Sequence, residues 1–415
     1  MREVAEVMTS GQDDILPDEP WGLLAILAII GFLLIGGMLT SLSVYVSVMQ
    51  QTFGWGEGAM GGGPVMLLLG MSAGNLIVGP VMRRCGKRGI FSIGTGIALS
   101  GWIAAGFIRS LPEFMGAMAL AGIGAGLATI VPGIAVISES FHRRRGLAVA
   151  LFIGSCALAS AAMPLASKWL IDAAGWRQAF WIFGALAGAI SLPIVRRLPD
   201  TIAGDGNRSQ EEHGLTVQQV LKLPAFWILA MVLTISQLSM NAILFNLIAY
   251  LRKTGFDTSE AVTLYGITNF MSLPGLMIGG YLSDRIRAYI LLPLILILQG
   301  AGTFALLGAG NGPGAIILFI LCWGSVAGLP AQSGSMLLGE IIGQRAYASM
   351  LGIIFTINGF VGALAPAIMG WAYEIAGGYS WPISLFAGLC LLAACASLLC
   401  RTHRTPNPSL LSLEA

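Results

Sequence analysis

The sequence predicts an all-α membrane protein with twelve transmembrane helices, arranged as two pseudo-symmetric six-helix bundles. Composition is the first reason: 56% of the 415 residues are apolar, 10% are charged, and the mean hydropathy is +0.81. A water-soluble domain carries about 25% charged residues, so this chain is not built to face water on all sides. The other two reasons are an internal duplication and a series of long apolar segments.

The second half of the chain repeats the first at an offset of 201 or 202 residues. The matching pairs are Gly79 and Gly280, Glu139 and Glu340, Arg144 and Arg345, Pro164 and Pro366, Asp172 and Glu374, and Gly175 and Gly377. A near-constant offset of about half the chain indicates an internal duplication. Because the two halves would share one topology, we expect two bundles related by a pseudo-two-fold axis along the membrane normal.

Twelve segments are apolar and long enough to cross a bilayer, which takes about 20 residues. They are residues 21–50, 59–82, 89–109, 113–138, 146–172, 177–197, 224–251, 260–283, 288–309, 313–339, 346–374 and 381–400. The expected organisation is a tail (1–20), a first bundle (21–197), a linker (198–223), a second bundle (224–400) and a tail (401–415). Within the linker, Thr216 is expected to cap a short surface helix that ends near Lys222.

The distribution of lysine and arginine predicts the orientation in the membrane. With a cytoplasmic N-terminus, 17 of the 22 basic residues fall on the cytoplasmic side and 5 on the outer side. Cytoplasmic loops carry the excess of basic residues, so both termini and the linker are expected in the cytoplasm. We expect a multi-pass protein of a bacterial inner membrane, with lipid as its surroundings.

All 20 acidic residues fall in connections or near helix ends, and the histidines fall in polar connections. A charge at the bilayer centre costs roughly 2.5–3.5 kcal/mol, so its absence favours substrate recognition by neutral hydrogen bonds. The candidate substrate-binding residues are polar groups in the apolar segments: Tyr45, Asn75, Gln237, Asn241, Asn269, Gln332 and Asn358. Each can also serve as a bond between neighbouring helices, and that alternative stays open.

Two loop motifs repeat between the halves: Gly280-Tyr-Leu-Ser-Asp284-Arg285, between helices 8 and 9, and its first-half copy in residues 79–88. The first of them is similar to a loop motif of the major facilitator superfamily, which the chain resembles over nearly its whole length. That copy has Arg83 where the family usually has aspartate, so the first-half gate is expected to be built differently. The resemblance implies a carrier in which two bundles rock about a site near the bilayer midplane.

Within the superfamily, the chain looks most like the monocarboxylate and oxalate/formate transporter group. The residues that carry this resemblance are 141–148 leading to Gly154, Gly175-Trp176-Arg177, and residues 18–22 at the entry to the first helix. The chain has Asn269 and Leu273 where monocarboxylate carriers have an acid and an arginine, and Asn358 where oxalate carriers have a lysine. The cationic groups that would hold a carboxylate are therefore missing at both places.

The resemblance also implies a cytoplasmic gate. Asp284 is expected near the start of the fifth helix, beside Arg144 and Arg145, when the protein faces outward. Glu139 and Glu340 are expected to pair with nearby arginines, among them Arg345. With Arg83, these residues form the predicted gate: Arg83, Glu139, Arg144, Arg145, Asp284, Glu340 and Arg345.

The sequence favours a secondary transporter for a small organic solute. The resemblance implies an organic acid such as a monocarboxylate and allows protons as a second partner. The alternatives are a carrier for a neutral or bulkier solute, in uptake or efflux, and a carrier-fold ligand sensor. We expect a monomer, no catalytic or metal-ligating residues, no cofactor and no nucleic-acid partner, because the sequence has no paired metal-ligand spacing and no basic stripe.

Overall fold

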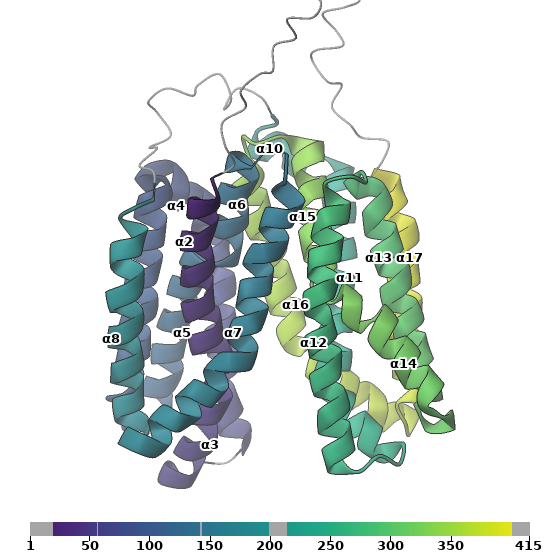
Figure 1. Cartoon of the computed structure of the whole chain (residues 1–415), viewed down its shortest axis with the longest axis horizontal. Helices are drawn as coiled ribbons and strands as arrows, with labels where there is room; N and C mark the ends of the chain where they lie inside the picture. The colour runs from purple at the N-terminus through teal and green to yellow at the C-terminus, as the bar shows by residue number, and fades with distance from the viewer. Residues whose placement is uncertain (1–19, 56, 142, 199–213, 401–415) are drawn as a thin grey trace, which may run out of the picture.

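The computed structural model describes residues 20–55, 57–141, 143–198 and 214–400. Two helical bundles stand side by side, one from each half of the chain (Figure 1). Their ribbons approach each other at the end where the short helix α10 (Val217–Leu221) lies and diverge toward the other end (Figure 1). We call the end with α10 the linker end and the other the far end.

The helices of the first bundle are α2 (Trp21–Gly31), η1 (Phe32–Thr40), α3 (Leu42–Phe53), α4 (Glu57–Ala105), α5 (Leu111–Ala128), α6 (Ile130–Ser140), α7 (Arg145–Ala174) and α8 (Trp176–Val195). Those of the second are α11 (Pro224–Lys253), α12 (Thr258–Ser283), α13 (Ala288–Ala305), η2 (Leu306–Asn311), α14 (Pro313–Cys322), η3 (Gly324–Val326), α15 (Leu329–Ile342), α16 (Tyr347–Ala376) and α17 (Ser380–Leu398). The described residues contain no β-strand, only an isolated bridge between Gly214 and Gly343.

Eleven stretches of the described residues are long and apolar enough to cross a membrane. One of them belongs to α4, whose 49 residues would extend about 74 Å if straight, more than twice the ~30 Å hydrocarbon core. The backbone of α4 leaves the helical conformation at Gly86 (φ 68°, ψ 178°), which favours glycine. Two spans therefore meet at Gly86, and the chain is the predicted all-α membrane protein of twelve spans.

Three spans that the sequence shows as continuous are interrupted inside the membrane. The first contains the π-helical stretch η1, and the fourth breaks between α5 and α6 at Thr129. The tenth unwinds after Trp323 and restarts as α15 beyond Gly328, whose φ of 87° is a left-handed conformation. Such breaks are tolerated where neighbouring protein groups satisfy the freed backbone.

Glycines let the helices of each bundle approach closely. A Cβ added at Gly122 of α5 would lie 2.1 Å from the Leu67 carbonyl of α4, and one at Gly101 would lie 2.4 Å from the Ala121 nitrogen. Both distances are shorter than any real contact, so these positions require glycine. Small residues drive helix association in lipid because they bring backbones together.

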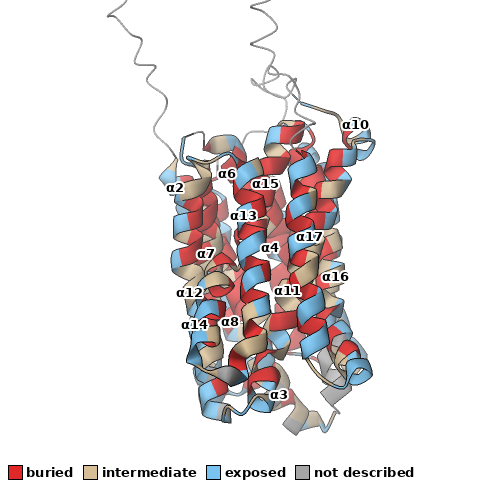
Figure 2. Cartoon of the chain, turned by 90° about the vertical axis from the view of Figure 1, so that its right-hand side faces the viewer, coloured by how far each residue is buried: buried red, intermediate tan, exposed pale blue. Residues whose placement is uncertain are grey.

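The outer faces of the bundles are apolar. Exposed residues run along α13 and α17 in Figure 2. The exposed residues of these two helices include the large apolar side chains of Leu294, Leu298, Leu392 and Leu398. A water-soluble protein rarely exposes an apolar surface of this extent, whereas hydrocarbon chains of lipid require it.

The linker helix has the N-cap that the sequence predicts. The Thr216 side chain accepts a hydrogen bond from the Gln219 N–H, and the Gln219 side-chain oxygen accepts one from the Thr216 N–H. Next to it, the Leu215 N–H donates to the Ile342 carbonyl at 3.0 Å. The start of the described linker is thus attached to the turn between α15 and α16.

Candidate functional site

Asp284 joins the two bundles at the linker end. It directly follows α12, and its carboxylate accepts hydrogen bonds from the Gly146 N–H at 2.5 Å and the Leu147 N–H at 3.1 Å. Both donors belong to the first turn of α7, where helix N–H groups have no partner within the helix and the dipole favours an anion. A Cβ on Gly146 would lie 2.6 Å from the Gly280 carbonyl, so this contact also needs glycine. The Asp284 carboxylate therefore lies at the start of the fifth span, α7.

Arg83 makes the corresponding contact in the other half. Its Nη1 donates to the Ser349 hydroxyl at 3.0 Å, and Ser349 is the third residue of α16. A Cβ on Gly79 would lie 2.8 Å from the Ser349 Cα, as close as the glycine contact on the other side. The close approach of the two helices is thus the same in both halves, and the charged group beside it differs.

Arg145 lies between these two contacts. Its Nε donates to the Ser138 hydroxyl at 3.0 Å and its Nη2 to the Tyr347 hydroxyl at 3.2 Å. Tyr347 in turn donates to the Ser335 carbonyl at 3.0 Å. Arg145 and Tyr347 are the first residues of α7 and α16, so the two halves meet here at equivalent positions.

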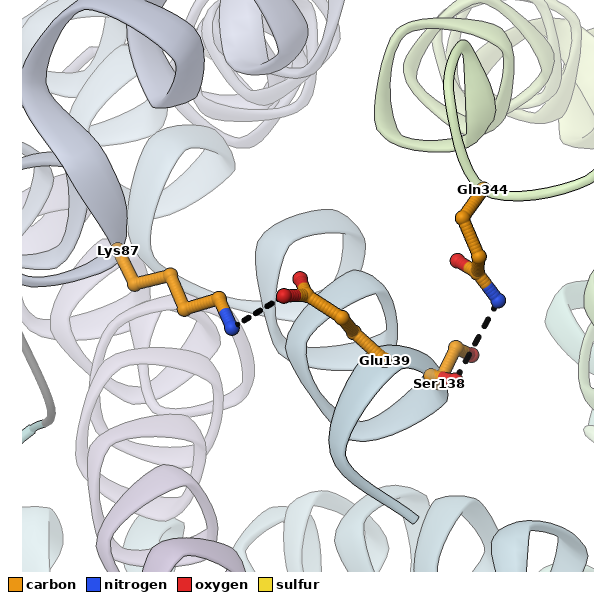
Figure 3. Close-up of polar contacts among 4 residues, drawn as sticks. All are labelled: Lys87, Ser138, Glu139 and Gln344. Carbon is orange, nitrogen blue, oxygen red and sulfur yellow. Dashed lines mark hydrogen bonds and ion pairs between the residues drawn. The ribbon is translucent and has the colours of Figure 1, made fainter. Parts of the chain in front are cut away.

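Glu139 forms an ion pair with Lys87 at 2.7 Å (Figure 3). The partner is a lysine rather than one of the expected arginines, and both residues belong to the first bundle. The neighbouring Ser138 carbonyl accepts a bond from Gln344 at 3.5 Å, which does cross between bundles (Figure 3).

The other predicted gate residues lie at the same end. Arg144 directly precedes α7, and Glu340 is in the last turn of α15. Arg345 lies in the turn before α16. All three are exposed.

The packed contact between bundles continues from the linker end to mid-depth. On one side it runs from Gly79 and Ser349 to the Thr356 hydroxyl, which lies 2.9 Å from the Ser72 carbonyl. These are seven residues apart along each helix, or about 10 Å. On the other side, a Cβ on Gly154 would lie 3.2 Å from Met277. The linker end is therefore closed over this depth.

Polar side chains of α11 and α16 meet at the level where this contact ends. Gln237 Nε2 donates to Asn241 Oδ1 at 3.1 Å, and Asn241 Nδ2 donates to the Gly362 carbonyl at 3.3 Å. Thr234 lies 2.8 Å from Asn358 Oδ1. We call these residues, Thr234, Gln237, Asn241 and Asn358, the amide cluster.

The structure brings three of the seven predicted substrate-binding residues together in the amide cluster. Asn75 is buried in α4, with its carbonyl against Gly352 of α16, and Asn269 is exposed on α12. Gln332 is buried nearer the linker end, where its Nε2 donates to the Gly146 carbonyl at 2.9 Å. Tyr45 is buried inside the first bundle.

The Tyr45 ring is surrounded by other aromatic rings. Its centroid lies 4.2 Å from that of Phe180 and 5.4 Å from that of Trp102.

Sequence reasoning also left several residues out of the site: Thr234, Ser349, Tyr347 and Lys87. For Tyr347 a signal was present, since it lies at the repeat offset from Arg145.

The acidic side chains of the described helices lie at the helix ends. Of the described acids within helices, Glu113, Glu139, Asp172, Glu260, Glu340 and Glu374 lie within the first or last turn of their helix. Within the described residues no group of histidine, cysteine and acidic side chains is arranged to hold a metal ion. What the centre offers a ligand is amide and hydroxyl groups.

The sequence profile of the Major Facilitator Superfamily matches residues 27–366. The chain belongs to the Major Facilitator Superfamily. Members of this superfamily are transporters and not enzymes, so the contacts at the linker end belong to a membrane carrier. The predicted similarity to the superfamily is confirmed.

Relatives within the superfamily include monocarboxylate transporters. The chain is 24% identical over 396 residues to monocarboxylate transporter 13 of Bos taurus, which covers 93% of this chain and 91% of that protein. It is 25% identical over 267 residues to agnestins efflux protein AgnL12 of Paecilomyces divaricatus, covering 63% of this chain and 59% of that one.

Among solved superfamily structures, the transporter FucP in the outward conformation is similar, with a TM-score of 0.72. The alignment covers 92% of this chain and 99% of that one at 14% sequence identity. At this identity the likeness shows the fold alone.

Proposed function

We propose that this transporter moves a small organic acid, such as a monocarboxylate, across the membrane by alternating access. The linker end and both termini lie in the cytoplasm of a bacterium, and the protein takes up its substrate from outside. The 17-to-5 distribution of basic residues supports this orientation.

The observation that carries alternating access is the closed linker end. Asp284 and Arg83 join the two bundles where glycines let the helices touch, and the bonds from Arg145 to Tyr347 and from Gln332 to Gly146 join them at the same end. A conformation open at the linker end requires these contacts to break. The two bundles would then pivot about the amide cluster, in the manner of related repeat-built carriers.

The amide cluster is the proposed substrate site. Gln237 is the fourteenth of the thirty residues of α11, and Asn358 the twelfth of the thirty of α16, so both lie near the bilayer centre. The relative named above that aligns with 93% of this chain is a monocarboxylate transporter, and this similarity favours an organic acid. Proton symport is included in the proposal because the resemblance to the monocarboxylate transporter group implies it.

A neutral or bulkier organic solute is the second candidate. The amide cluster supports it, because amides recognise uncharged groups, and the similarity to a named efflux protein allows the opposite direction of transport. A ligand sensor on the carrier fold would bind such a solute without moving it.

Counterflow into proteoliposomes tests the proposal. Purified protein is reconstituted with unlabelled short-chain acids inside, and accumulation of labelled acid from outside is measured. We expect saturable accumulation, reduced by alanine at Gln237, Asn241 or Asn358 of the amide cluster with equal protein incorporated. Binding without exchange would identify a sensor, and normal uptake by all three variants would remove the proposed site.

A further inference from the structure

The orientation of the Asn241 amide is determined by the backbone of α16. Residue 366 is a proline and has no N–H, so the Gly362 carbonyl four residues earlier lacks its usual helical donor. Asn241 supplies that donor at 3.3 Å. A carbonyl oxygen only accepts hydrogen bonds, so the group of Asn241 that faces it must be the nitrogen.

Gln237 is oriented in consequence. With its nitrogen on Gly362, Asn241 presents its oxygen to Gln237, and the Gln237 group 3.1 Å away must be the Nε2 donor. The Gln237 carbonyl oxygen, Oε1, takes no part in this chain of bonds. One end of the amide cluster is therefore a hydrogen-bond acceptor.

Gln237 lies on the face of α11 that points between α15 and α16. Leu233, four residues earlier, contacts Gly334 of α15, and Thr234, three residues earlier, contacts Asn358 of α16. The helical repeat of 3.6 residues places Gln237 between these two directions. Its side chain is partly exposed, whereas Met231 and Phe245 mark the most exposed face of α11 elsewhere.

An acceptor at mid-depth without a nearby cation selects the protonation state of an acid. A carboxylate anion has only acceptors and meets the Gln237 oxygen unfavourably, while a protonated carboxyl group has one O–H donor. The described acidic side chains within the helices lie in their terminal turns, so none is at this level to carry a proton for the substrate.

We infer that the substrate acid is bound in its neutral form, with its O–H donating to Gln237 Oε1, and that the proton crosses on the substrate. This rests on the proposed function as an organic-acid carrier. The carboxylate takes up one proton from the outer solution, crosses as the neutral acid, and loses that proton to the inner solution. One proton moves with each acid, and no group of the protein changes its protonation.

Three probes of similar shape test this inference: propionic acid, propionamide and ethanesulfonate. Each competes for counterflow of labelled propionic acid in proteoliposomes between pH 5 and pH 8, with protein-free liposomes subtracted for passive diffusion. Thermal stabilisation of the purified protein gives a second readout of binding. We expect competition by the acid to strengthen as pH falls, competition by the amide to be independent of pH, and none from the sulfonate.

Uptake of two acids with well-separated pKa values distinguishes titration of the substrate from titration of a group of the protein. We expect the pH of half-maximal uptake to move with the pKa of the acid used. The same midpoint for both acids, or equal competition by the sulfonate, would overturn the neutral-acid inference and leave an organic-acid carrier in place. If the amide alone binds or is transported, the proposed organic-acid function fails, while the requirement that the ligand donate a hydrogen bond to Gln237 stands. If none of the three probes binds or competes, both proposals fail.

The variant Gln237→Met removes the acceptor and keeps a side chain of similar length. Loss of one hydrogen bond is expected to weaken competition by the neutral acid and by the amide about fivefold. Asn246→Leu is the matched control, since Asn246 lies on the same helix and bonds to its own Ala242 carbonyl. Equal competition in Gln237→Met and wild type, with comparable thermal stability, would contradict the inference.

Discussion

The two halves of the closed end use one geometry with opposite charges. Asp284 and Arg83 stand 201 residues apart, each a few residues beyond a glycine that lets its helix touch the partner bundle. Asp284 accepts two backbone N–H groups at the start of α7, whereas Arg83 can only donate and bonds to the Ser349 side chain. An anion at a helix N-terminus is stabilised by about 0.3–1 kcal/mol, and a cation there is disfavoured.

This difference teaches that the duplicated fold preserves the backbone contact more strictly than the polar group beside it. Close approach requires glycine whatever the neighbouring charge, because a Cβ would overlap the partner helix. We therefore expect the Asp284 side to hold the bundles together more strongly than the Arg83 side.

The largest effect is expected for Asp284→Ala. The change leaves the Gly146 and Leu147 N–H groups without their charged acceptor, at a cost of about 1.5–3 kcal/mol. The population should shift toward a state open at the linker end. Spin labels at positions 84 and 287, in a cysteine-free background, should move apart, while labels at 168 and 263 on the far end move together. Unchanged distances at both ends would contradict this role.

A somewhat smaller effect is expected for Gly79→Ala. The added Cβ would lie 2.8 Å from the Ser349 Cα, and such overpacking costs about 1–3 kcal/mol. Because the clash exists only when the bundles touch, the same labels should report opening of the linker end. Gly96→Ala is the control, since a Cβ there meets nothing within 4 Å. A shift of equal size in both variants would mean that the effect is not local.

A change of opposite sign is expected for Arg83→Asp. The variant makes the first half resemble the second, and the new carboxylate should be stabilised at the start of α16 by about 0.3–1 kcal/mol. The closed linker end should become more populated, and exchange should slow in the counterflow assay. Faster opening in this variant would show that the Ser349 bond contributes more than the charge.

The smallest effect is expected for Lys87→Met. The variant breaks the ion pair with Glu139, whose side chain is about half-exposed. Because both partners belong to one bundle and the pair is partly screened by water, it contributes at most about 1 kcal/mol to stability. Because neither residue touches the second bundle through this pair, label distances at both ends should stay as in wild type. A clear increase in the label distance at the linker end would show that the ion pair holds the end of α6 in its contact with α16.

The sequence alone determined the class of the protein, the number of spans and the duplication, because these depend on hydrophobic length and on residue identity at a constant offset. It also predicted Asp284 near the start of the fifth helix, through the resemblance of the loop motif around it. Only the tertiary structure decided the partners: that Glu139 meets Lys87, that Tyr347 meets Arg145, and that Gln332 lies at the closed end apart from the amide cluster.

The same distinction separates the members of the predicted site. Gln237 and Asn241 are polar residues in an apolar segment, which the sequence shows, but the direction of each amide depends on a carbonyl of α16 that Pro366 leaves without a donor. Tyr45 is likewise a polar residue in an apolar segment, but its ring lies among the aromatic rings of the first bundle. The spacing of residues along one helix predicts which of them share a face. Which helix or cavity that face contacts is determined only by the packing of helices that are distant in the sequence.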